Sequence, residues 1–138
     1  MDNRPIILID DDLEDLGLLQ EAFAALNVVN EIITFNQGSK FLEYIRTTAK
    51  KSFFILCDIN MGEISGMDIK KRIFDDERLR IKCIPFLFLS TSGAAPSINT
   101  AYSYNVQGYF IKPDNFEKLK DMLHSMIKYW GHSQHPNS

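Results

Sequence analysis

The sequence has little cysteine and no long hydrophobic run. Its only two cysteines are Cys57 and Cys83, and they do not form a CxxC pair. We expect both to be reduced thiols that pack as small hydrophobic groups. No apolar stretch is long enough to cross a bilayer, and residues 1–5 lead into an apolar run without the features of a signal peptide. The sequence therefore predicts a cytoplasmic protein with no membrane segment.

An excess of positive charge is also missing. The formal net charge at pH 7 is −3, and no run of lysine and arginine stands out. Because nonspecific nucleic-acid binding depends on clustered positive charge, we expect no direct DNA binding. The remaining composition, 45% hydrophobic and 24% charged over 138 residues, is typical of one globular domain.

Short apolar runs alternate with amphipathic segments along the chain. Five runs predict strands, at residues 6–9, 31–35, 53–57, 85–89 and 108–111. Each is followed by a segment with apolar residues at helical spacing, and such an alternation implies parallel pairing with right-handed crossovers. We therefore predict an α/β fold, a flavodoxin-like doubly wound five-stranded parallel sheet in the order 2-1-3-4-5, with helices on both faces.

Local signals add detail to this prediction. Asp12 is expected to cap the first helix and Asn36 the second, while residues 75–82 are expected to form a charged connection. We expect one domain over residues 1–130 and a flexible polar C-terminal tail over 131–138. The tail contains two histidines, whose spacing is more typical of a chance pair than of a metal site.

Polar side chains end four of the five predicted strands. They are Asp10 and Asp11 after the first strand, Asp58 after the third, Ser90 after the fourth and Lys112 after the fifth. In the predicted order, the carboxyl ends of the first and third strands flank the crevice where ligands of open α/β sheets bind. Three clustered carboxylates stay ionised only beside a cation, and oxygen ligands with room for water suit Mg²⁺.

A carboxylate cluster, a divalent metal ion, an ammonium group and a hydroxyl together make a site for a phosphoryl group. An aspartate can carry a phosphoryl group as an acyl phosphate, so Asp58 is the predicted nucleophile. Lys112 supplies a mobile positive charge, and Ser90 supplies a hydroxyl donor.

Four motifs then carry a resemblance to a known family. They lie at residues 7–11, 56–61, 88–90 and 108–113. In this order and at these separations, they make the chain similar to the receiver domain of two-component response regulators, of the single-domain, chemotaxis-regulator-like kind. The resemblance covers about residues 4–130.

The resemblance implies that Asp58 accepts a phosphoryl group from a phosphohistidine on a sensor histidine kinase or a histidine phosphotransfer protein. Asp11 and Asp58 would bind Mg²⁺ (or Mn²⁺) directly, and the backbone carbonyl of Asn60 would complete the protein ligands. Asp10 would act through metal-bound water. Lys112 would hold the phosphoryl oxygens, together with a hydroxyl group.

That hydroxyl group belongs to Ser90. Tyr109 would report the conformational change that follows phosphorylation of Asp58. The face formed by the helix near 98–102, the strand at 108–111 and the helix at 116–130 would change shape. Because no DNA-binding or catalytic domain follows in the sequence, we expect this face to be read by a downstream protein or by a second copy in a homodimer.

Three positions bear on how closely the chain follows the family. Ser90 stands where threonine is commoner, and Gly62 stands where relatives often have proline. The loop after the predicted nucleophile is therefore expected to be less rigid. The Lys112–Pro113 bond is often cis in relatives, and the sequence does not decide its state here.

Three other functions are weighed against this one. A Mg²⁺-dependent phosphatase-like enzyme with an aspartate nucleophile usually needs a second aspartate two residues later, where this chain has Asn60. A non-phosphorylated pseudo-receiver that only binds protein should have lost an acid or the lysine, and none is lost. A flavodoxin-like cofactor binder needs a hydroxyl- or glycine-rich phosphate loop after the first strand, and this chain has none there. We therefore expect no enzyme, but a phosphoacceptor with slow self-dephosphorylation at most.

Overall fold

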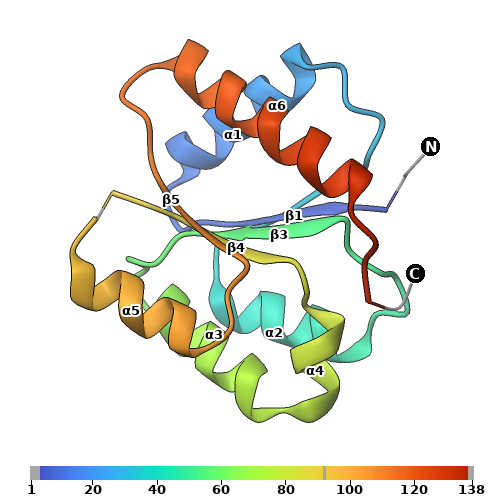
Figure 1. The fold of residues 1–138 in the computed structure, drawn as a ribbon, viewed down its shortest axis with the longest axis vertical. Helices are drawn as coiled ribbons and strands as arrows, with labels where there is room; N and C mark the ends of the chain where they lie inside the picture. Colours follow the sequence, from blue (N-terminus) through green and yellow to red (C-terminus); the bar gives the residue numbers. More distant parts are fainter. Residues whose placement is uncertain (1–3, 92, 137–138) are drawn as a thin grey trace.

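A parallel sheet forms the middle layer of the protein and helices cover both of its faces (Figure 1). The structure is a computed structural model that describes residues 4–91 and 93–136. Its strands are β1 (Ile6–Ile9), β2 (Ile32–Phe35), β3 (Phe54–Cys57), β4 (Phe86–Ser90) and β5 (Gly108–Ile111). All pairings are parallel and the order is β2-β1-β3-β4-β5, which confirms the predicted topology.

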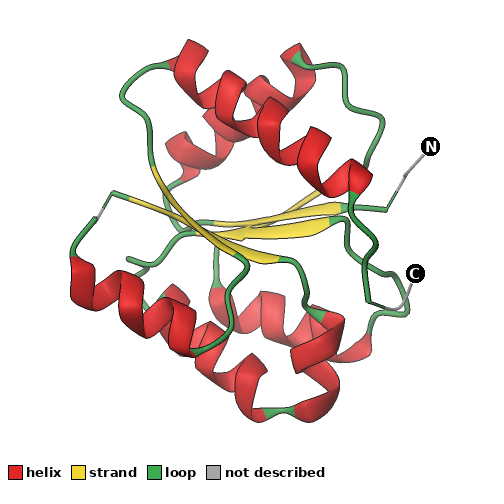
Figure 2. Ribbon diagram, viewed as in Figure 1, coloured by secondary structure: helices red, strands yellow, loops and turns green. Residues whose placement is uncertain are grey.

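The helices divide between the two faces of the sheet (Figure 2). One face is covered by α1 (Leu13–Ala25) and α6 (Phe116–His132). The other is covered by α2 (Gly38–Thr47), α3 (Gly66–Asp75), α4 (Glu77–Lys82) and α5 (Ala95–Ser103). Such a doubly wound sheet leaves the carboxyl edge of its strands open for a site.

The strands β1 and β3 are apolar at every position because all of their residues are buried between the two helical layers. In β1, Ile7 and Ile9 belong to the core on the α2–α5 side, whereas Ile6 and Leu8 belong to the core against α1 and α6. Successive side chains of a strand point to opposite faces, so a two-sided strand has no place for a polar residue. Polar side chains therefore collect just beyond the strand ends.

The predicted helix caps have different outcomes. The Asp12 carboxylate accepts hydrogen bonds from two first-turn N–H groups of α1, as expected. The prediction for Asn36 is wrong, because α2 begins after Gln37, whose side chain makes no capping hydrogen bond. Gly38 starts this helix so close to α3 that an added Cβ would lie 2.7 Å from the Ile69 side chain. Close packing, rather than a polar cap, fixes this helix start.

The connection predicted at residues 75–82 is instead mostly helical. It contains α4, whose first turn is capped by the Asp76 carboxylate through the N–H groups of Arg78 and Leu79, at 3.0 and 3.3 Å. Leu79 is buried in the core beneath the sheet. The sequence did not indicate this helix, because the stretch is highly charged and only Leu79 of α4 is buried.

The C-terminal segment contacts the domain more closely than the sequence indicated. The helix α6 continues to His132, two residues beyond the predicted domain end. His135 is buried, its Nε2 lies 2.8 Å from the Phe53 carbonyl oxygen, and its ring stacks on the Phe53 ring at 5.7 Å. Flexibility of residues 131–138 stays a prediction, and residues 137–138 lie outside those described.

Three smaller expectations can also be compared with the structure. Both cysteines are buried and free, as predicted. Within residues 4–91 and 93–136, the cis peptide bond is Ile84–Pro85, so Lys112–Pro113 is trans. None of the helices in the described part of the chain is long and apolar enough to cross a membrane.

Lys70 is the exception to the apolar core. This α3 side chain is fully buried, and its Nζ has no hydrogen-bond partner among the described residues. It lies 5.3 Å from the centre of the Phe86 ring. Burial lowers the Lys70 pKa from 10.5 to about 8, because the charged form is poorly solvated there. At neutral pH the ammonium group therefore opposes folding.

We predict that Lys70→Met raises the free energy of unfolding at pH 7 by about 1–3 kcal/mol, since an unpaired buried charge is replaced by a flexible apolar chain. The advantage should shrink between pH 8 and 10.5, where folded wild type has released the proton that the unfolded chain still binds. Urea denaturation across pH measures both effects. Lys71→Met, at an exposed neighbour, is the control, and equal effects of the two variants would contradict the prediction.

Candidate functional site

Two aspartates lie side by side where β1 and β3 end. Ile9 pairs with Cys57 in the sheet, so the residues that follow, Asp10 and Asp58, leave adjacent strands at the same level. Their exposed fractions are only 2% and 7%, whereas Asp11 is exposed. One carboxylate oxygen from each of the three lies within 4.8 Å of the others. The structure thus brings together the three predicted acids.

The loop after Asp58 is held against this cluster by two glycines. The N–H of Gly62 donates to Asp11 Oδ2 at 2.8 Å. A proline at this position would lack that donor, so the departure from the family pattern supplies a contact here. At Gly66, an added Cβ would collide with the Asp58 carbonyl oxygen. Only glycine therefore allows α3 to start so close to the end of β3.

Lys112 reaches the cluster from the end of β5. Its Nζ lies 3.1 Å from Asp10 Oδ2, 2.8 Å from Asp15 Oδ2 and 3.5 Å from Asp58 Oδ1. Its backbone N–H donates to the carbonyl oxygen of Ser90 at 2.8 Å. The predicted lysine is therefore the common partner of carboxylates from two loops and one helix.

Ser90, Tyr109 and Asn60 complete the predicted set. Ser90 ends β4, is fully buried and pairs with Ile111 in the sheet, directly before the lysine. Tyr109 is partly buried on β5 and meets the Phe88 ring edge to face at 6.1 Å. Asn60 is exposed in the loop two residues after the buried carboxylate. The roles predicted for these three residues remain predictions.

Asp15 is the site residue that sequence reasoning missed. Its carboxylate makes the shortest contact of the Lys112 ammonium, 2.8 Å from Oδ2 to Nζ. The available signal was its position three residues after the Asp12 cap. This spacing places Asp15 in the first turn of α1, on the same side as its cap and next to the strand end that carries Asp10.

Burial and crowding make the cluster electrostatically unfavourable. Burial, followed by repulsion from Asp10, raises the Asp58 pKa from 3.8 to about 6. Burial also raises the pKa of Asp10. Burial alone would lower the pKa of Lys112, but the hydrogen bond to Asp15 and the charges of the two buried acids raise it. One ammonium group does not fully compensate these carboxylates.

The donor set fits a divalent cation that prefers oxygen. Three carboxylates with one exposed member offer charged oxygen ligands and leave room for water, which suits Mg²⁺ or Mn²⁺. The raised pKa values of the two buried acids point the same way, because they show too little positive charge nearby. A cation here would supply that charge.

The fold and the site together define a class of small α/β domain that holds a carboxylate cluster and a lysine at one edge of its sheet. The chain belongs to the family of response regulator receiver domains, whose family model matches residues 6–124. Receiver domains are typically phosphorylated on an aspartate by histidine kinases, bind Mg²⁺ or Mn²⁺ at their acidic cluster and act on downstream targets.

Individual relatives agree with this assignment. The probable methanogenesis regulatory protein FilR2 of Methanothrix harundinacea is 31% identical, over 91% of this chain and 82% of FilR2. The crystal structure of the phosphorylated cyanobacterial phytochrome response regulator RcpA matches with a TM-score of 0.87 at 28% identity, covering 98% and 99% of the two chains. Rcp1 of Synechocystis sp. is 24% identical, over 92% of this chain and 88% of Rcp1. The Mn²⁺-bound structure of Rcp1 matches with a TM-score of 0.83 at 22% identity, covering 96% and 99%.

The raised pKa of Asp58 predicts a stability effect with a definite sign. Between pH 3.8 and 6 the folded protein binds this proton more tightly than the unfolded chain, so stability falls as the pH rises through that window. At pH 7.5 we expect Asp58→Asn to raise the free energy of unfolding by about 1–3 kcal/mol. Mg²⁺ should stabilise wild type but not this variant.

Urea denaturation with and without Mg²⁺ measures these differences. Asp121→Asn removes an exposed carboxylate from α6 and serves as the charge-matched control. A destabilised Asp58→Asn protein, or equal effects of the two substitutions, would contradict the electrostatic account of the site.

Proposed function

We propose that this receiver domain accepts a phosphoryl group on Asp58 from a phosphohistidine of a sensor histidine kinase or a histidine phosphotransfer protein. The observation that carries the proposal is the setting of this one carboxylate. It directly follows the central strand β3, lies among two further acids and has a lysine ammonium 3.5 Å from Oδ1. An oxygen nucleophile and a positive charge for the incoming phosphoryl oxygens are thus within reach of each other.

In the transfer, an Asp58 carboxylate oxygen forms a bond to phosphorus while the bond between phosphorus and the histidine nitrogen breaks. The electron pair of the broken bond leaves with the imidazole. Asp11 and Asp58 would hold Mg²⁺ with the Asn60 backbone carbonyl, and Asp10 would act through water. The bound cation would neutralise negative charge on the carboxylates and the phosphoryl group. Rcp1, a relative crystallised with Mn²⁺, supports this choice of cofactor.

Lys112 would change partners during the transfer. It now donates to Asp15 and Asp10 and is farther from Asp58. An acyl phosphate adds about −1.5 to −2 charge and new acceptor oxygens at Asp58. Lys112 would therefore move toward the phosphoryl group and release Asp15. Hydrolysis of the acyl phosphate would be slow, because Asn60 offers no acid or base two residues after the nucleophile.

The signal would pass through Ser90 and Tyr109 to the face formed by α5, β5 and α6. The Ser90 hydroxyl would turn toward the phosphoryl oxygens and draw the following loop with it. Tyr109, one strand away, would move its ring into the vacated space beside β4. The changed face would then be read by a downstream protein or form a homodimer.

Incubating the protein with acetyl phosphate and Mg²⁺ should add one phosphoryl group, at Asp58 alone. Mass spectrometry after borohydride trapping locates the site. Asp58→Asn should take up none, and Asp11→Asn should react more slowly because one anionic ligand for the cation is lost. Asp12→Asn is the control, since asparagine still caps α1. Labelling of Asp58→Asn equal to wild type would refute the assignment.

Beryllium fluoride with Mg²⁺ should move Ser90 and Tyr109 together, because it mimics the phosphoryl group at Asp58. NMR spectra or paired crystal structures, with and without the mimic, measure this movement. Tyr109→Phe tests the hydroxyl separately from the ring. If the mimic binds while the face of α5, β5 and α6 stays unchanged, the proposed signalling route is wrong.

A further inference from the structure

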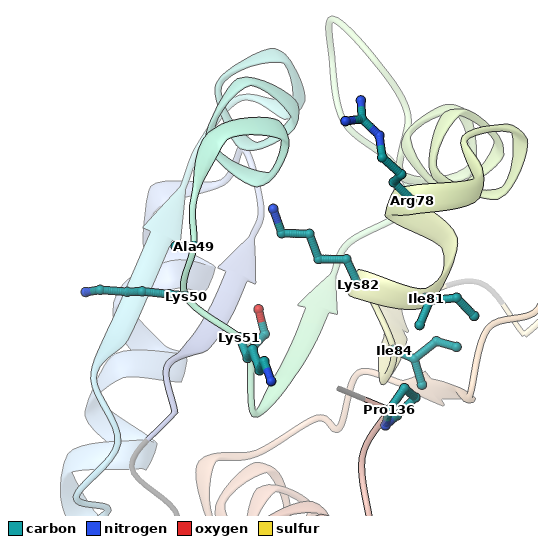
Figure 3. Close-up of a pocket in the computed structure, with 9 residues that line it drawn as sticks. Ala49, Lys50, Lys51, Arg78, Ile81, Lys82, Ile84 and Pro136 are labelled. Atoms are coloured by element: carbon teal, nitrogen blue, oxygen red, sulfur yellow. The ribbon is translucent and has the colours of Figure 1, made fainter. Parts of the chain in front are cut away.

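A cationic pocket lies at the amino-terminal ends of β3 and β4, opposite the carboxyl ends where Asp58 lies. It has a volume of about 410 Å³ and lies between the segment 49–52, which leads into β3, and the segment 78–84, which leads into β4 (Figure 3). Pockets that hold small ligands span about 300–1,000 Å³. The pocket therefore has room for a small molecule, and it shares no lining residue with the acidic cluster.

The charges that line this pocket are of one sign. Its described lining includes Lys50, Lys51, Arg78 and Lys82 and no acidic residue. Lys82 extends from α4 toward the segment 49–51, and Arg78 projects from the start of the same helix (Figure 3). Within the part of the chain that the structure describes, the Arg78 side chain makes no hydrogen bond or ion pair. Its guanidinium group is thus available to an anion.

Lys82 is fixed in the pocket by two neighbouring carbonyl groups. Its Nζ donates to the Ile45 oxygen at 2.6 Å and to the Thr48 oxygen at 2.7 Å. An ammonium group has three donors, so one N–H remains for a ligand. Because α4 is tied in this way to the end of α2, the positive charge is held in place before any ligand arrives.

Lys50 differs from Arg78 and Lys82. It points away from the pocket in Figure 3, and its Nζ pairs with Glu31 at 3.0 Å. Both of these side chains are more than half exposed. Its charge is therefore partly neutralised on the outer surface, which makes Lys50 a matched control for the lysines and the arginine of the pocket.

The remaining lining suits a carbon skeleton. Ile81, Ile84 and Pro136 lie near one another on one side of the pocket (Figure 3). Pro136 follows His135, whose stacking on Phe53 holds the end of the chain at this edge. The pocket thus offers an apolar side next to concentrated positive charge, in addition to the polar side chain of Ser52.

We propose that this pocket is a second ligand site, which binds a small organic phosphate with two or more negative charges. Phosphate groups concentrate charge and accept the forked hydrogen bonds that arginine provides. The apolar side would contact the organic part of the ligand. The site is independent of phosphorylation at Asp58 and stands whether or not that reaction occurs.

Titration with ADP in EDTA, without Mg²⁺, tests the proposal on the full chain. Amide NMR shifts should appear at residues 49–52 and 78–84, while Asp58 and Lys112 stay unchanged. Adenosine, which lacks the charge, should not bind. Added NaCl should weaken ADP binding because the cations are accessible to solvent. Citrate is a polycarboxylate without an apolar ring, so it should bind at least about tenfold more weakly than ADP because it leaves Ile81, Ile84 and Pro136 uncovered.

Two substitutions distinguish binding in the pocket from general attraction to the surface charge of the protein. Arg78→Gln should weaken ADP binding about tenfold, the loss expected for one charge-assisted hydrogen bond. Lys50→Gln removes an equal charge and should change it less than about twofold. ADP shifts confined to the Asp58 edge, equal effects of the two variants, or citrate binding as tight as ADP binding would each overturn the proposal.

Discussion

The structure depends on the burial of two like charges, Asp10 and Asp58, beside a single ammonium group. The carboxylates are almost fully buried at adjacent strand ends, and the Lys112 ammonium contacts both of them. This group is shared with Asp15, so it leaves the Asp58 pKa raised to about 6. Because too little positive charge lies beside the carboxylates, a divalent cation would be favoured here. Without a cation, repulsion between the carboxylates opposes folding.

The two-sided burial of the sheet explains why the site lies where it does. Every residue of β1 and β3 is buried against one of two helical layers, so charge can enter only past the last strand residue. Burial likewise makes Lys70 destabilising, because α3 carries its amine into the core without a hydrogen-bond partner among the described residues. Two kinds of buried charge thus oppose folding, and only the one at the carboxyl ends of the strands lies in the proposed phosphoryl site.

The amino edge of the sheet carries features that the carboxyl edge does not require. The helix α4 ties Lys82 to the end of α2, and the C-terminal segment places His135 against Phe53. Together they enclose the cationic pocket on the side remote from Asp58. In this chain the acidic cluster and the cationic pocket lie at opposite ends of the strands, so a ligand at one does not occupy the other.

The sequence by itself determined the strands, their order and the acids and lysine at their ends. A strand that is buried on both faces appears in the sequence as an uninterrupted apolar run. Parallel pairing then places the carboxyl ends of the strands on the same side of the sheet. Tertiary structure alone decided the contact of Asp15 with Lys112, the hydrogen bond from Gly62 to Asp11, the helix α4 and the burial of His135. These features depend on distances between segments remote in the chain, or on one buried residue in a charged stretch. Neither leaves a periodic pattern in the sequence.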